Sequence, residues 1–127
     1  MVKSYTSKEQ SEMLIKLGIP IESADMTYFY DEDNGNLLFP TPFIINDRDG
    51  YYSRIYCWSL AALRACLPPA ISIDGILYVF ESHNTFDNMW VYEYKFEDIS
   101  APLYSKSSNE IDAAVEMIVQ LKENKMI

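Results

Sequence analysis

The feature that most constrains this chain is a run in which every second residue is a large aromatic one. Trp90, Tyr92, Tyr94 and Phe96 alternate with an aliphatic residue and two charged ones. A period of two is the pattern of a β-strand, and it places all four rings on one face. That face is either the wall of a hydrophobic core, covered by helices, or a surface that contacts a partner.

Length and composition favour a single globular domain. The chain has 127 residues, a common size for one domain, so we expect one domain over residues 1–127. Hydrophobic residues make up 49% of the sequence and aromatic residues 14%, which argues against a disordered chain. We therefore expect a dense core, an adhesive surface, or both.

The charge balance disfavours nucleic acid as a partner. The chain carries 19 acidic and 10 basic residues, a net charge of −9, and its basic residues are scattered. Binding to a phosphate backbone depends on clustered Lys and Arg, so no nucleic acid is expected. Carboxylates gather in segments 22–33 and 81–98. Proteins with basic patches are therefore the favoured partners.

Cysteine usage and hydropathy point to the cytoplasm. We predict that Cys57 and Cys66 lie on one helix, nine positions apart, on opposite faces and too far from each other for a disulfide. This favours a reducing compartment. The sequence has no apolar run of the kind that signals export or membrane insertion. We expect a cytoplasmic protein with no membrane contact.

Three segments are predicted to be helical. Residues 7–17 begin with a capping box and stop before Gly18 and Pro20. Residues 58–67 carry leucines at i, i+3 and i+7, end at a Pro-Pro pair, and have a serine at their start that is suited to cap a helix. Residues 110–124 are apolar on one side and acidic on the other.

The remaining segments are predicted to be strands and turns. Residues 26–30 form a strand, from which an Asp-Asn-Gly turn returns the chain through residues 37–39 as a hairpin. Residues 71–82 form a strand with a tight turn or bulge at Asp74-Gly75, and residues 83–88 turn the chain into the aromatic strand. Residues 40–52 form a mobile surface loop. The predicted fold is α+β, with one antiparallel sheet of about four to five strands, two longer helices and a short N-terminal helix.

The sequence contains no recognisable motif for metal binding, cofactor binding or catalysis. Counted from Asp31, a glycine falls fifth and Pro42 falls twelfth, whereas a calcium loop needs glycine sixth and glutamate twelfth. His83 is the sole histidine and is expected in a turn, while zinc requires three or four ligands. The prediction is no metal site, no cofactor and no catalytic residue.

The function class that we favour is a non-catalytic interaction module that binds a protein partner or itself. Tyrosine and tryptophan dominate interface hot spots, and the surrounding carboxylates would steer a basic partner. The residues predicted to make contact are Tyr51, Tyr52, Trp90, Tyr92 and Tyr94. The alternative for these rings is that they only close the core.

A second function class is a small enzyme or ligand-binding domain. Its cleft would lie between residues 40–52 and the sheet, with His83 as acid or base and Glu81 or Asp87 as the orienting carboxylate. No serine or cysteine lies in a recognisable activating context, so this class has less support. The sequence does not predict a small-molecule ligand.

Several segments resemble a known family. They are Trp58-Ser59-Leu60-Ala61-Ala62-Leu63 with Leu67-Pro68, and Ile111 to Ile118 with Leu121 to Asn124. These resemble small uncharacterised proteins carried by phages, prophages and mobile elements of Bacteroidetes-type bacteria. Segments 7–10 and 21–26 are similar as well, and the likeness departs at residues 64–66. The resemblance implies a mobile-element origin and a cytoplasmic setting, and it carries no activity.

Overall fold

The computed structural model describes residues 4–45 and 53–127 and confirms the α+β class. The described residues form three α-helices and one short 3-10 helix, which are α1 (Lys8–Lys16), η1 (Ile21–Ser23), α2 (Leu60–Ala65) and α3 (Glu110–Glu123). One antiparallel sheet has the order β2-β1-β3, with β1 (Met26–Tyr30), β2 (Phe43–Ile44) and β3 (Ser53–Cys57). The second has the order β4-β5-β6-β7, with β4 (Ala70–Ile73), β5 (Ile76–Asn84), β6 (Trp90–Phe96) and β7 (Ile99–Ser107).

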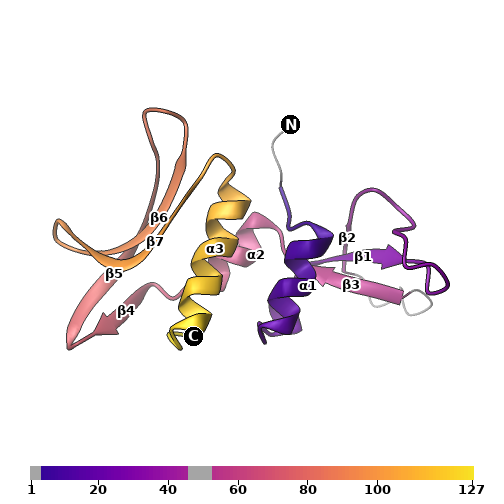
Figure 1. The fold of residues 1–127 in the computed structure, drawn as a ribbon, viewed down its shortest axis with the longest axis horizontal. Helices are drawn as coiled ribbons and strands as arrows, with labels where there is room; N and C mark the ends of the chain where they lie inside the picture. Colours follow the sequence, from indigo (N-terminus) through magenta and orange to yellow (C-terminus); the bar gives the residue numbers. More distant parts are fainter. Residues whose placement is uncertain (1–3, 46–52) are drawn as a thin grey trace.

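The helices lie between the two sheets (Figure 1). The four-stranded sheet is at one end of the molecule, followed by α3 and α2, then by α1, and the three-stranded sheet is at the other end. The prediction of one sheet with four to five strands is therefore wrong in one respect, because the strands divide into two sheets. One hydrophobic cluster nevertheless runs from Leu14 of α1 through Leu63 of α2 and the face of α3 to Tyr94 of β6.

The last helix, α3, forms as its sequence predicts. The side chain of Asn109 accepts a hydrogen bond from the backbone N–H of Asp112, and acidic residues occupy the first turn. The apolar side of α3 packs on β6, β7 and α2. Its buried residues are Ile111, Ala113, Ala114, Val115, Met117, Ile118 and Leu121.

The four-stranded sheet is a meander whose turns follow local sequence. Asp74 and Gly75 have φ values of 53° and 82°, so they make the predicted two-residue turn between β4 and β5. Farther along, Glu93 pairs with Tyr104 and Lys95 pairs with Ser100, so β7 bulges by two extra residues. The bulge contains Pro102, which cannot donate a ladder hydrogen bond.

The predicted first hairpin is wrong beyond its turn. The chain turns through residues 31–36, but the return makes only an isolated bridge between Tyr30 and Leu37. Pro40 and Pro42 interrupt the segment that follows, because proline has no N–H to donate. Besides β3, the strand that pairs with β1 is β2, inside the predicted loop 40–52, whose residues 46–52 lie outside the described part of the chain.

The predicted helix over residues 58–67 begins later than expected. Ser59 is the N-cap, as predicted, and accepts a hydrogen bond from the Ala62 N–H at 3.2 Å, so the helix starts at Leu60. Cys57 therefore belongs to β3, not to this helix. Both cysteines are free thiols, and burial raises the pKa of the Cys57 thiol to about 12. His83 likewise lies in β5 and not in a turn.

Truncating the buried side of α3 is predicted to destabilise the whole fold. Ile118 is fully buried, so Ile118→Ala should lower the free energy of unfolding by about 2–5 kcal/mol through lost burial and a residual cavity. The matched control, Glu116→Ala, changes an exposed residue of the same helix and should stay within about 0.5 kcal/mol of wild type. Urea denaturation measures both. Equal effects would show that this face does not carry the core.

Candidate functional site

The two central tyrosines of the aromatic strand belong to the core. Tyr92 and Tyr94 are 0% exposed, and the ring of Phe80 packs against both at centroid distances of 5.3 and 5.4 Å. The prediction that they contact a partner is therefore wrong, because α3, α2 and the neighbouring strands already cover them. Trp90 is half-buried, and Tyr51 and Tyr52 lie outside the described residues. Of the predicted contact residues that the structure describes, Trp90 alone is partly accessible.

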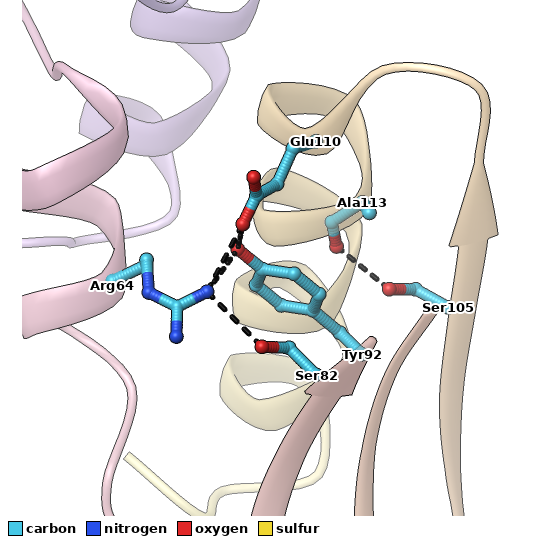
Figure 2. A network of polar contacts seen from close by, with 6 residues as sticks. All are labelled: Arg64, Ser82, Tyr92, Ser105, Glu110 and Ala113. Carbon is cyan, nitrogen blue, oxygen red and sulfur yellow. Dashed lines mark hydrogen bonds and ion pairs between the residues drawn. The ribbon is translucent and has the colours of Figure 1, made fainter. Parts of the chain in front are cut away.

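The hydroxyl of Tyr92 takes part in a hydrogen-bond network that joins side chains from four elements (Figure 2). It donates to the Glu110 carboxylate at 2.6 Å, and Arg64 Nη1 donates to Tyr92, Glu110 and Ser82 at 3.0, 3.0 and 3.2 Å. Ser82 and Tyr92 come from β5 and β6, Arg64 from α2 and Glu110 from the start of α3. Arg64 also lies over the Tyr92 ring, at 5.6 Å from its centroid. The network pairs polar groups where α2 and α3 pack on the sheet.

The only histidine does lie beside a carboxylate, but not the predicted one. His83 Nδ1 is 3.8 Å from Glu93 Oε2, whereas the predicted partners were Glu81 and Asp87. The Ser100 hydroxyl donates to Glu93 at 2.7 Å instead of to His83, so His83 is not placed as the base for this serine. The described part of the predicted cleft loop, at β2, lies at the opposite end of the molecule from β5 (Figure 1). His83 and residues 40–45 therefore share no cleft.

Two further properties bear on function. In residues 4–45 and 53–127, no group of three or more His, Cys, Asp or Glu side chains is arranged to hold a metal ion. In the same residues, no helix is both long and apolar enough to cross a bilayer.

The most distinctive surface is the end of the four-stranded sheet where its β4–β5 and β6–β7 turns meet. We call the apolar residues of the inner face at this end the sheet-end patch: Ile76, Phe96 and Ile99, which are exposed, and Ile73 and Tyr78, which are half-buried and pack against the core. Ile76, Phe96 and Ile99 are 41–59% exposed, and the register pairs Ile76 with Ile73 and Phe96 with Ile99. Apolar clusters that stay open to solvent mark interaction sites more often than isolated exposed residues do.

Acidic residues border the sheet-end patch. Asp74 lies in the β4–β5 turn, and Glu97 and Asp98 lie in the β6–β7 turn, all exposed. The basic residue nearest to Glu97 in the sequence, Lys95, forms an ion pair with Glu81, whose carboxylate lies 3.9 Å from the Lys95 Nζ. The patch therefore combines an apolar surface with a negative rim.

A second exposed apolar group comprises Leu38, Phe39, Phe43 and Ile44. Its neighbours in the chain include residues 46–52, which lie outside the described residues. The sheet-end patch is the better defined of the two surfaces.

No protein-family model, curated protein or solved structure matches this chain.

The buried tyrosines predict a loss of stability at alkaline pH. Burial raises the pKa of Tyr94, whose hydroxyl donates to the Pro68 carbonyl at 2.8 Å, above the ordinary value of 10.0. Above that pH the unfolded chain loses protons that the folded chain keeps, so the free energy of unfolding should fall as pH rises beyond about 10 and stay unaffected by this group below it. Urea denaturation between about pH 8 and 11 measures the decline.

The matched variant is Tyr94→Phe. At about pH 8 it should cost roughly 0.5–1.5 kcal/mol for the lost hydrogen bond, and it should make the alkaline decline shallower. A decline of the same steepness in both proteins would contradict the assignment to Tyr94.

Proposed function

We propose that the protein is a non-catalytic interaction module and that its contact surface is the sheet-end patch. The observation that carries this proposal is the exposure of Ile76, Phe96 and Ile99 at the end of a sheet face that has Tyr92 and Tyr94 buried at its centre, bordered by three carboxylates. Burying such side chains on association removes apolar area from water at roughly 25 cal/mol per Å². Binding thus has a driving force that the free protein leaves unused.

The chemistry of the patch favours a basic protein as partner over a second copy of this chain. Two copies facing each other would bring Asp74, Glu97 and Asp98 close to the same residues of the other copy, and like charges at a desolvated interface are unfavourable. A partner with an apolar depression rimmed by Lys and Arg satisfies both the patch and its rim. The net charge of −9 would speed encounter with such a partner.

The setting that we propose is the cytoplasm. Its support is that Cys57 and Cys66 are both free thiols, which fits a reducing compartment. A mobile-element origin, as the resemblance of residues 58–68 and 111–124 implies, is part of the same proposal.

The proposal is tested by capturing partners from the native host with matched surface variants. Phe96→Ser/Ile99→Ser removes two exposed apolar side chains of the patch, while Tyr104→Ser removes a similarly exposed one from the outer face of the same sheet. A partner identified with wild-type protein should bind the double variant at least about tenfold more weakly and Tyr104→Ser with unchanged affinity, measured by calorimetry on the purified pair.

Varying the salt concentration distinguishes the contribution of electrostatic steering to binding from that of apolar contact. Raising the ionic strength from about 0.1 to 1 M should slow association of wild type with the partner, because screening shortens the reach of the acidic rim. Partners that bind the double variant as tightly as wild type would refute the patch as the contact surface. A partner surface that proves acidic would refute the predicted complementarity.

A further inference from the structure

A groove of about 610 Å³ lies at the other end of the molecule, between α1 and β3. Four residues of α1 and three consecutive residues of β3 line it, together with Ile21, Tyr30 and Gly35. The residues that line it from α1 are Lys8, Glu12, Ile15 and Lys16, and those from β3 are Arg54, Ile55 and Tyr56. Consecutive residues of a strand point to opposite faces, so a wall made of three of them includes the backbone edge of the strand.

That edge of β3 faces no described strand. β3 pairs with β1 on one side only. One residue past its end, the edge is covered by the N-terminal segment, because Thr6 N–H donates to the Trp58 carbonyl at 2.9 Å and Trp58 N–H donates to the Thr6 hydroxyl at 3.0 Å. The chain then turns away from the edge of β3 at the N-cap Ser7 and forms α1. The N-terminal segment therefore covers this edge only up to the point where the groove begins.

The direction of the backbone groups follows from the same contacts. Successive residues of a strand direct their N–H and C=O groups to alternate sides. Trp58 directs both groups toward the N-terminal segment, away from β1. Tyr56, two residues earlier, therefore directs its N–H and C=O to that side too, which is the side of the groove that it lines.

The β7 edge of the four-stranded sheet differs from the β3 edge, because a side chain hydrogen-bonds to its backbone. The side-chain amide of Gln120 on α3 donates to the Tyr104 carbonyl at 2.8 Å and accepts from the Tyr104 N–H at 3.1 Å. These two bonds occupy the backbone positions that an added strand would use on β7. Pro102 interrupts the same edge. At β3, by contrast, α1 contacts the strand and a groove lies between the two elements.

The lining of the groove is apolar with cations along it. Ile15, Ile21 and Ile55 supply apolar surface, and three basic side chains line the groove against one carboxylate, in a chain where carboxylates outnumber cations by 19 to 10. The carboxylate, Glu12, is paired with Lys8 at 3.3 Å. Lys16 is exposed. The lining of the groove therefore carries more cations than carboxylates, on a protein that is acidic overall.

We propose that the groove binds an extended, acidic segment of a protein partner, which adds to β3 as a further strand at Tyr56. Apolar side chains at alternate positions of that segment contact the isoleucines, and a carboxylate beside them pairs with Lys16. Backbone hydrogen bonds supply affinity that does not depend on sequence, and the side-chain contacts supply the selectivity. This site is separate from the sheet-end patch and prefers the opposite partner charge.

The test is a selection from a displayed library of random octapeptides on the full-length protein. Wild type should enrich peptides with apolar residues at alternate positions and at least one Asp or Glu. Lys16→Glu reverses one charge in the groove, and it should weaken the best enriched peptide at least tenfold by fluorescence anisotropy. The control is Lys122→Glu on α3, which lies outside the groove and should leave the affinity unchanged.

Backbone methylation tests the strand geometry. A derivative of the enriched peptide that is N-methylated at alternate amides should lose binding in one of the two registers and keep it in the other, because only alternate amides face β3. No enrichment, equal binding of Lys16→Glu, or equal tolerance of methylation in both registers would each overturn the proposal. Phe96→Ser/Ile99→Ser should bind the peptide like wild type, so failure here and failure of the sheet-end patch are distinguishable.

Discussion

The packing of α3 against its surroundings is the constraint on which the rest of the structure depends. Its buried side meets β6, β7 and α2 at once, and the Gln10 side chain of α1 donates to Asp112 at 2.8 Å, so one helix contacts both halves of the molecule. The Arg64 network fixes how α2 and α3 sit on the sheet, because one guanidinium bonds to groups from three other elements. Surfaces at the two ends of the molecule are held at a fixed separation by this helical layer (Figure 1).

Much of the secondary structure could be predicted because its determinants are local. The capping box at Ser7 and Gln10, the turn at Asp74-Gly75 and the alternation in residues 90–96 each depend on neighbours within a few positions, and each is present in the structure. The early start predicted for the second helix has a local cause too. The leucine spacing indicates a helix but not its first residue, which the Ser59 cap decides.

The sheet division and the candidate sites could not be predicted, because they depend on contacts between distant segments. Alternation places Tyr92, Tyr94 and Phe96 on one face, but only the position of α3 decides that the first two are buried and the third is 42% exposed. The groove beside β3 likewise requires that Thr6 pair with Trp58, across 52 positions of sequence. No pattern within either segment carries that information. The exposed Ile99, next to two acidic residues, was the nearest local signal of the sheet-end patch.

The contact between Gln120 and Tyr104 has a consequence for how the chain is made. The helix that closes the β7 edge follows the sheet in sequence, so a ribosome completes all four strands before it delivers the amide that shields them. During that interval the outermost strand can recruit a strand from another nascent chain, and the Pro102 bulge is the remaining barrier. Slow docking of the terminal helix would therefore favour aggregates, and the yield of monomer would depend on translation rate and on chaperones that hold the emerging sheet.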